Sequence, residues 1–570
     1  MNAAQTTSEA GAGAAAASRA AAYAAPPARV AVPVQLRVPP ISTAAAVSKR
    51  PAARPPSRAQ PAVHLSPVEA KIRALLLDTA AFVQRQQPDR PPLVLRVAGG
   101  WVRDKLLGRD SDDMDIAIDT MKGEPFARHL KEYMETVGLE MGSIATIQVN
   151  PDKSKHLETA TARVFGLDVD FVHLRTEVYD ESSRNPTVNF GTPLEDALRR
   201  DITINALFYN LHSGEVEDLT GTGISDLNSG LVRTPLDPLQ TFIDDPLRVL
   251  RVIRFATRFH YEIVRHVLEA AADEQIKTAF MKKITRERVG VELDKMLAGQ
   301  DPVRALRLIR DIGFYPLVFT PPPELPADVP IQSERAVLGS HIIDLIHSES
   351  MLAKLGLLSL PLTPEDLRNL HLAAALLPYR TLTYKHKNKD LSVVRFVVCN
   401  SIKLSNIDGD TAHALVNDAP KIRDHALRNA SKSLDRMTLG LLVRDLGGRP
   451  LGAKWDLAVL MALAEDLADL AAQEADPFAM RLDSDAATSV IAIYAKLLAD
   501  IAAHGLQNAY QLKHIVDGKD LASLLSLRPG PQIGRYLQIV MEWQLTHPTG
   551  TRAQCVEYML TRHGHTGNTK

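Results

Sequence analysis

The fold is decided by residues 93–119, which read LVLRVAGGWVRDKLLGRDSDDMDIAID. This segment opens with a short apolar strand that ends at Gly99 and Gly100, and an amphipathic helix follows the two glycines. Glycines here allow close backbone approach, and a helix N-terminus presents free N–H groups to an anion. Arg103 falls in the first turn of that helix, within reach of a phosphate. Because many strand-to-helix turns hold glycines for steric reasons, this unit alone does not define a site.

An acidic strand follows the helix. Residues 113–119 alternate with a period of two, so that the apolar side chains face one way and Asp113, Asp115 and Asp119 face the other. Two neighbouring carboxylates repel by roughly 4 kcal/mol at about 4 Å and an effective dielectric constant of about 20. A hard dication such as Mg²⁺ removes this repulsion and prefers oxygen ligands, whereas a solvated edge strand disfavours Asp. A second acidic strand, residues 167–172, offers Asp170 as a third carboxylate, and such a set could hold two Mg²⁺ ions.

Composition excludes several classes of protein. The chain of 570 residues is 45% hydrophobic and 23% charged, which is typical of a soluble globular protein. Its only two cysteines, Cys399 and Cys555, exclude a disulfide scaffold. No apolar run is expected to reach the roughly 18 residues that span a bilayer. We therefore expect no membrane association, and no obligate protein partner is evident.

The first 66 residues form a leader of different composition. Residues 1–60 carry seven basic residues and one acidic residue, whereas the remaining chain carries 59 and 66. Such an Ala-, Pro- and Ser-rich segment buries too little apolar surface to offset its ordering entropy, so we predict disorder. It resembles an organellar transit peptide, which predicts a mitochondrial or plastid location, with cytoplasmic and nuclear forms from alternative starts. A plain low-complexity tail is the alternative.

The remaining chain divides into a mixed region and a helical region. Residues 67–210 alternate strand and helix patterns, and helical periodicity takes over after about residue 240. The fold class is therefore α+β, with a head at 67–210, a helical neck at 211–300, and a helical body and tail at 301–570. In the body, His386 lies in a basic run that we interpret as a solvated loop rather than an RNA anchor.

A basic stripe begins in the neck. Pro246 suits the first turn of a helix, with Asp245 at the cap position. Arg248, Arg251 and Arg254 recur every three residues, and apolar residues between them supply a buried side. By spacing alone, a solvated face and a ligand-binding face explain the stripe equally well.

Five motifs in a fixed order resemble a known family. They are residues 99–104 with Asp113 and Asp115, then residues 199–207, 218–227, 244–251 and 285–293. Together they look like the polymerase-β-like nucleotidyltransferase head and the neck of class II tRNA nucleotidyltransferases, the CCA-adding enzymes. Residues 155–160 and 169–175 are similar to the eukaryotic branch of that family.

The resemblance implies template-independent addition of C, C and A to the 3′ end of tRNA from CTP and ATP, with pyrophosphate released. It implies that Mg²⁺ is held by Asp113 and Asp115, and Asp170 is the third catalytic candidate. Nucleotide contacts are implied for Gly100, Arg103 and Arg200, with Asp201 supporting Arg200. The family uses residues matching Asp245 and Arg248 as an amino-acid template for the base, and Arg251 and Arg254 follow, placed for phosphate or ribose contact.

The template pair obeys a simple donor and acceptor logic. Cytosine and adenine each offer an exocyclic amine beside a ring nitrogen acceptor, so a carboxylate accepts from the amine and a guanidinium donates to the ring. Uracil and guanine present a carbonyl and a ring N–H instead. Each mismatch leaves buried polar groups unpaired, so discrimination against UTP and GTP should be large.

The remaining expectations concern the RNA and the alternatives. Residues 301–570 are expected to hold the tRNA acceptor stem and elbow by shape and phosphate contacts, and residues 141–155 match the family's flexible loop. The alternatives are CC-only or A-only addition, a bacterial-type poly(A) polymerase, and a catalytically dead RNA-binding protein. The last is disfavoured because the acidic and basic motif residues are all present.

Overall fold

The computed structural model describes residues 63–111, 113–139, 145–147, 159–178, 187–347, 362–448, 450–528 and 530–563. The predicted leader, apart from its last four residues, lies outside these ranges. So does most of the segment 141–155. All described residues belong to one unit, Pro55–Lys570.

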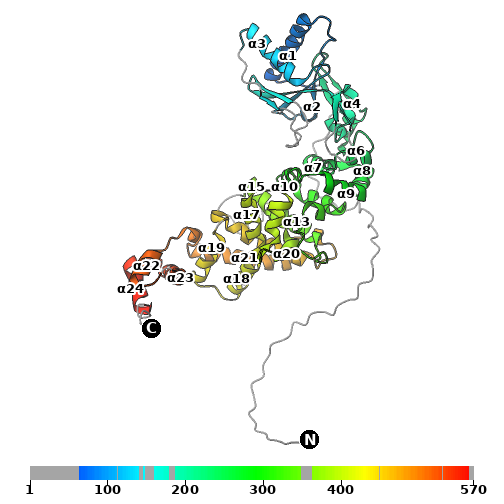
Figure 1. Ribbon diagram of the computed structural model, residues 1–570. Coiled ribbons are helices and arrows are strands. Elements are labelled where there is room, and N and C mark those ends of the chain that lie inside the picture. Colours follow the sequence, from blue (N-terminus) through cyan, green and yellow to red (C-terminus); the bar gives the residue numbers. More distant parts are fainter. Residues whose placement is uncertain are drawn as a thin grey trace, which may run out of the picture. The chain divides into compact units, whose positions relative to one another are not determined.

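The head is built on a seven-stranded mixed sheet in the order β3-β4-β5-β2-β1-β8-β9 (Figure 1). Only β2 and β5 pair in parallel, and the other neighbours are antiparallel. The strands are β1 (Leu95–Ala98), β2 (Asp113–Ile118), β3 (Ala145–Ile147), β4 (Thr159–Val164), β5 (Leu167–His173), β8 (Phe208–Asn210) and β9 (Glu215–Glu217). Since β9 belongs to this sheet, the sheet extends past residue 210, where the sequence analysis ends the head.

Helices cover the apolar face of this sheet. The head helices are α1 (Pro67–Gln86), α2 (Gly100–Leu106), α3 (Gly123–Thr136) and α4 (Pro193–Leu198), with the short η2 (Thr203–Asn205). Helix α3 packs against β4 and β5, and the Phe126 and Phe171 rings lie 5.5 Å apart. This approach needs Gly123, because a Cβ there would lie 1.9 Å from the Phe171 carbonyl oxygen. Helix α1 begins where a capping box of Ser66 and Glu69 satisfies its first N–H groups.

The predicted acidic strand is β2, and its side chains alternate as expected. Met114, Ile116 and Ile118 are buried, whereas Asp113 and Asp115 are exposed. A separate small cluster of buried residues includes Ala117, with Ala98, Leu174, Ala197, Ala206 and Phe208. A separate hairpin pairs β6 (Arg175–Val178) with β7 (Thr187–Phe190).

The neck is helical, apart from the short parallel pair β10 (Leu231–Val232) and β11 (Glu262–Ile263). Helix α7 carries the predicted basic stripe and packs against α10 and α11. The neck helices are α5 (Gly223–Ser229), α6 (Pro238–Asp244), α7 (Arg248–Phe259), α8 (Arg265–Ala271), α9 (Glu274–Lys283) and α10 (Arg286–Leu297), followed by α11 (Pro302–Asp311) and α12 (Tyr315–Val318).

The body packs its helices around α20 (Asp456–Ala471), which contacts α13, α15, α17, α18 and α21 (Figure 1). The other body helices are α13 (Ser333–His347), α15 (Pro364–Ala375), α16 (Val393–Phe396), α17 (Asn406–Asn417), α18 (Ala419–Ser431), α19 (Arg436–Leu446) and α21 (Asp485–Ala503). The body also contains the short 3-10 helices η3 (Leu377–Tyr379), η5 (Gly452–Lys454), η6 (Pro477–Ala479) and η7 (Ala509–Gln511). A π-helix, η4 (Val397–Ser401), directly continues α16.

Two features of the body bear on the expectations above, and the expectation about the run at His386 was wrong. Helix α21 is by length and composition apolar enough to cross a membrane, but it packs against α18 and α20. The basic run around His386 is not a loop, because β12 (Thr383–His386) and β13 (Lys389–Ser392) form an antiparallel hairpin.

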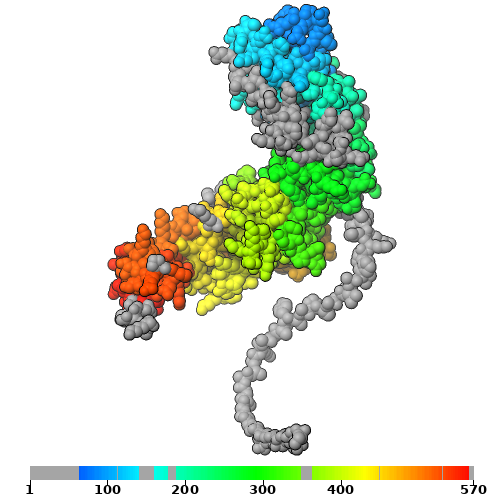
Figure 2. Space-filling view, viewed as in Figure 1, coloured from blue at the N-terminus to red at the C-terminus, as the bar shows by residue number. Residues whose placement is uncertain are grey.

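The C-terminal helices form a second, smaller core. Helices α22 (Gly518–Leu524), α23 (Pro531–Thr546) and α24 (Arg552–His563), orange to red in Figure 2, enclose Val516, Val540, Trp543, Cys555 and Met559. Helix α23 also contacts α19 of the body. Cys399 and Cys555 are both free thiols, in agreement with the sequence analysis.

Candidate active site

The acidic centre lies where β2 and β5 run side by side. Their parallel register aligns Asp113 with Asp168 and Asp115 with Asp170. Register partners on adjacent strands project from the same face of a sheet. Although the Asp115 side chain is accessible to solvent, the protein atoms around it desolvate its carboxyl and raise its pKa. The negative charges of Asp170 and Asp113 raise this pKa further, while Arg200 opposes them. The arrangement therefore concentrates negative charge that a cation would neutralise.

The fit of this centre to a metal ion rests on two carboxylates. Within the described residues, no three side chains of His, Cys, Asp or Glu form a group that could hold a metal ion. Asp170, the third predicted carboxylate, is the register partner of Asp115, and its Oδ1 accepts a hydrogen bond of 2.5 Å from the Thr161 hydroxyl. Asp113 and Asp115 supply exposed oxygen ligands on one strand, which fit a hard divalent cation.

The glycine turn brings Arg200 close to the start of α2. Gly99 has a φ of 72°, and its N–H donates to the Leu207 carbonyl oxygen at 2.9 Å. This backbone conformation, with a ψ of −123°, favours glycine, and a Cβ here would also lie 2.7 Å from Nη1 of Arg200 and force that guanidinium to shift. Helix α2 then begins at Gly100, as the sequence predicted.

Arg103 lies in the first turn of α2, but its donors are used within the protein. Its guanidinium makes bonds of 2.9 and 2.8 Å to both carboxylate oxygens of Asp104 and also donates to Asn205. It lies 5.3 and 4.8 Å from the ring centroids of Phe255 and Phe259 on α7. Arg103 is thus a buried link between α2 and α7, and its predicted contact with the nucleotide stays a prediction.

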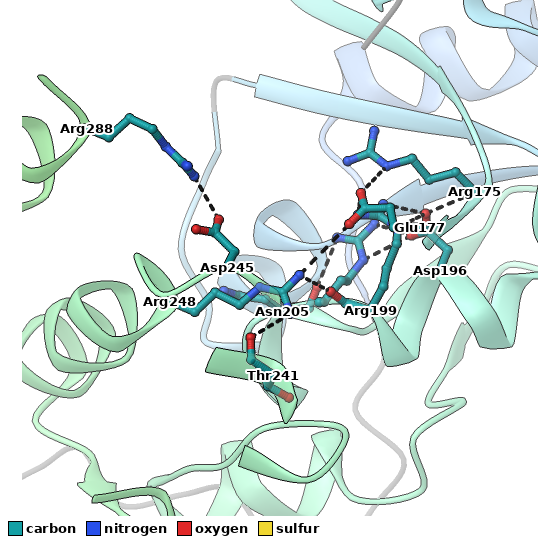
Figure 3. A network of polar contacts seen from close by, with 10 residues as sticks. Arg175, Glu177, Asp196, Arg199, Asn205, Thr241, Asp245, Arg248 and Arg288 are labelled. Carbon is teal, nitrogen blue, oxygen red and sulfur yellow. Dashed lines mark hydrogen bonds and ion pairs between the residues drawn. The ribbon is translucent and has the colours of Figure 1, made fainter. Parts of the chain in front are cut away.

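Asp196, which sequence reasoning missed, holds Arg200 in place. Its Oδ2 accepts bonds of 3.1 and 2.8 Å from Arg200, and its Oδ1 accepts from Arg199 (Figure 3). Burial raises the pKa of Asp196, but Arg200 and Arg199 outweigh it and bring the pKa to about 2. The expected helper, Asp201, contacts Arg251 at 2.7 Å and Asn205 at 3.0 Å instead. Asp201 is therefore a partner of α7 rather than of Arg200.

These buried pairs predict a loss of stability in acid. Burial opposes ionisation of Asp201, but Arg251 lowers its pKa from 3.8 to about 2. The ionised carboxylates of Asp196 and Asp201 thus stabilise the fold above about pH 4, and each contribution of about 2 kcal/mol is lost as the pH falls toward 2. Urea unfolding between pH 5 and pH 2.5 measures this, and Asp201→Asn should reduce the pH dependence. An unchanged dependence in the variant would contradict the assignment.

Helix α7 starts later than the sequence predicted. Its first residue is Arg248 and its N-cap is Leu247, whereas Asp245 ends α6 and Pro246 lies between the helices. Asp245 still supports the turn, since its Oδ1 accepts the Leu247 N–H at 3.2 Å. The remaining oxygen, Oδ2, pairs with Arg288 of α10 at 2.8 Å (Figure 3).

The three arginines of the stripe all contact protein groups. Arg248 donates to the backbone carbonyls of Arg199 at 2.7 Å and Thr241 at 3.4 Å. Arg251 pairs with Asp201, and Arg254 pairs with Glu292 of α10 at 2.6 Å. Glu292 also lies 3.6 Å from Arg251. The expected phosphate or ribose contacts of Arg251 and Arg254 would therefore have to compete with carboxylates.

A second acidic residue that the sequence analysis missed, Glu177, lies on β6. It pairs with Arg175 at 2.8 Å and with Arg199 at 2.9 Å, and its Oε2 lies 4.0 Å from Arg248 (Figure 3). No sequence motif or regular spacing identifies Glu177 as a site residue. Glu292 could have been identified, because it lies four residues after Arg288 within the motif at residues 285–293.

Two protein-family models match parts of the head and neck. Residues 95–233 match the family described as the poly A polymerase head domain, and residues 270–328 match the probable RNA and SrmB-binding site of polymerase A. Together with the sheet and its paired carboxylates, these matches define a nucleotidyltransferase.

Comparison with individual proteins narrows this class. The mitochondrial CCA tRNA nucleotidyltransferase of Saccharomyces cerevisiae is 39% identical over 526 residues, covering 88% of this chain and 94% of the relative. A tRNA nucleotidyltransferase of Schizosaccharomyces pombe is 34% identical, covering 87% and 98%. A solved CCA-adding enzyme in complex with ATP shares the fold with a TM-score of 0.56 and 18% identity, covering 89% and 96%. The chain belongs to the family of CCA tRNA nucleotidyltransferases.

Proposed function

We propose that this protein adds C, C and A to the 3′ end of tRNA, using CTP and ATP. The observation that carries the proposal is the pair Asp113 and Asp115 on β2, beside Arg200, in a chain of this family. The tRNA 3′ hydroxyl attacks the α-phosphate of the nucleotide, the bond to the pyrophosphate breaks, and pyrophosphate leaves. The mitochondrial relative supports a mitochondrial location, and residues 1–66 are proposed as the transit peptide.

Asp113 and Asp115 would hold the divalent metal that the family implies, and we propose Mg²⁺. When bound, such ions supply a more reactive hydroxyl nucleophile and neutralise charge on the phosphates. Arg200, fixed by Asp196, places a positive charge near Asp115 and is suited to the triphosphate. Gly100 is proposed to let the backbone of α2 approach the nucleotide.

Base choice is proposed for Asp245 and Arg248 in the neck. Their protein contacts orient both side chains, with Arg288 on the carboxylate and two carbonyl oxygens on the guanidinium. Each carboxylate oxygen has two lone pairs, so Asp245 is able to accept from a base amine while it keeps Arg288. As the sequence analysis expects, we propose that the head carries out catalysis, the neck recognises the base, and the body and tail bind tRNA.

A primer series tests the proposed function. Purified full-length protein with Mg²⁺ is offered tRNAs that end before CCA, after C and after CC, with each nucleotide separately and together. We expect CTP to extend the first two substrates, ATP to extend the third, and growth to stop at one CCA end. Addition that stops after CC, or addition of A to the tRNA ending after CC with no addition of C to the other two tRNAs, would identify a partial enzyme. A long A tail would identify a poly(A) polymerase.

A further inference from the structure

The hairpin β12–β13 is a compact basic projection of the body. Its strands pair Thr383 with Ser392, Tyr384 with Leu391, Lys385 with Asp390 and His386 with Lys389. Only two residues, Lys387 and Asn388, connect the strands. Every residue from Lys385 to Leu391 is exposed.

The base of this hairpin is fixed to the body core. The Val393 N–H donates to the Leu382 carbonyl at 3.0 Å, which closes the base of the hairpin. The Tyr384 ring packs edge-on against Phe396 with centroids 5.4 Å apart, and the Thr381 N–H donates to Asn417 of α17 at 3.0 Å. The projection is therefore presented in a defined orientation rather than as a random loop.

The hairpin is basic, and its lysines are not neutralised. Lys385, Lys387 and Lys389 form no ion pair with any carboxylate in the described part of the chain. The acidic groups nearby are Asp390, opposite Lys385 in the register, and Glu324, which lies 4.0 Å from His386. These three lysines lie within five residues of one another on one hairpin.

The turn adds a second observation. Lys387 and Asn388 have φ values of 47° and 62°, the left-handed conformation at both central positions of a two-residue turn. Such turns favour Asn and Gly, and lysine is disfavoured there because of its Cβ. A lysine thus occupies the tip of the projection despite its conformational cost, and such costs cluster at functional positions.

We propose that this hairpin binds the phosphate backbone of the tRNA substrate, a proposal that rests on the proposed function. Lysine is a compact point charge that contacts phosphates without reading bases, which suits an enzyme that acts on many tRNAs. Only Leu391 is a large exposed apolar side chain on the hairpin. That is too little apolar surface for insertion into a membrane interface, which needs an apolar face as well as basic residues.

The main test removes the three charges in the full-length protein. The variant Lys385→Gln/Lys387→Gln/Lys389→Gln should raise the KM for tRNA about tenfold, with kcat and the KM for CTP unchanged. The slope of log affinity against log salt should fall by about 2. The matched control Lys71→Gln/Arg85→Gln/Lys131→Gln removes three exposed basic side chains on the head helices α1 and α3 and should change neither value. Equal effects in both variants, or none in the hairpin variant, would overturn the proposal.

A single substitution separates RNA binding from stability. Asn tolerates the left-handed conformation better than lysine, so Lys387→Asn should unfold at the same or higher temperature yet bind tRNA about twofold to threefold more weakly. Unchanged affinity would assign a local structural role to Lys387.

The hairpin is testable apart from the proposed function, and one further outcome would overturn its assignment. Gel-shift measurements of tRNA binding do not need catalysis, so the hairpin remains testable if the parent adds no nucleotide and the proposed function fails. If the triple lysine variant loses binding to anionic phosphatidylserine vesicles but keeps its affinity for tRNA, the lysines belong to a membrane-binding surface, and the proposal is overturned.

Discussion

Replacing Asp113 or Asp115 by Asn is expected to reduce nucleotide addition about a thousandfold or more, because each carboxylate supplies oxygen ligands to the divalent ion. Metal ions stabilise such transition states by several kcal/mol, and about 4 kcal/mol corresponds to a factor of about 1000. The measurement is single-turnover addition of C to a tRNA that lacks CCA. Removal of divalent ions with EDTA should reduce the rate of addition by the parent protein by at least the same factor.

Stability measurements separate this effect from misfolding. The raised pKa of Asp115 means that its ionised form is less favourable in the folded state than in the unfolded chain. Asp115→Asn should therefore keep or increase the free energy of unfolding at pH 7, even as addition is lost. Asp78→Asn on α1 is the matched control, since Asp78 is exposed, and it should change neither property. Retained addition by Asp115→Asn would refute the metal assignment.

Replacing Asp245 by Ala is expected to lower discrimination against UTP and GTP about a hundredfold. A site that hydrogen-bonds a substrate rejects a mismatched group because buried polar atoms would be left unpaired. Without the carboxylate, the carbonyl groups of uracil and guanine no longer face an acceptor. The measurement is kcat/KM for each of the four nucleotides on tRNA ending before CCA and after CC.

Two further variants complete this experiment. Glu269→Ala on α8 removes an exposed carboxylate that pairs with Arg265, and it should leave selectivity unchanged. Arg288→Ala removes the partner of Asp245, so it should relax selectivity less than Asp245→Ala does. If Asp245→Ala lowers the rate with all four nucleotides equally, the carboxylate shapes the neck but does not read the base.

Much of the fold followed from local patterns. The alternation of residues 113–119 predicted β2 and its two faces, and the glycine pair predicted the start of α2 at Gly100. These features depend on neighbours a few residues apart, because a strand repeats every two residues. The basic run around His386 was misinterpreted because a two-residue turn of Lys and Asn lacks the usual glycine signal.

The partners of the charged residues were harder to predict. Arg200 was identified as a site residue, but its anchor Asp196 was not, and Asp201 was paired with the wrong arginine. Arg254 is buried and pairs with Glu292, 38 residues further along the chain, a contact that the sequence analysis did not predict. The long arginine side chain can reach several possible partners. The packing of α7 against α10 determines which carboxylate it contacts.

The sequence by itself determined which chemistry this protein carries: carboxylates on one strand, glycines before a helix, and an arginine-rich helix, all in a fixed order. Only the tertiary structure decided which of these groups stay accessible. Asp113 and Asp115 remain exposed, while Arg103 and Arg254 are buried among aromatic rings and carboxylates. The physical reason is that residue order fixes local geometry, whereas ion pairs form wherever distant elements bring opposite charges within a few ångströms and exclude water.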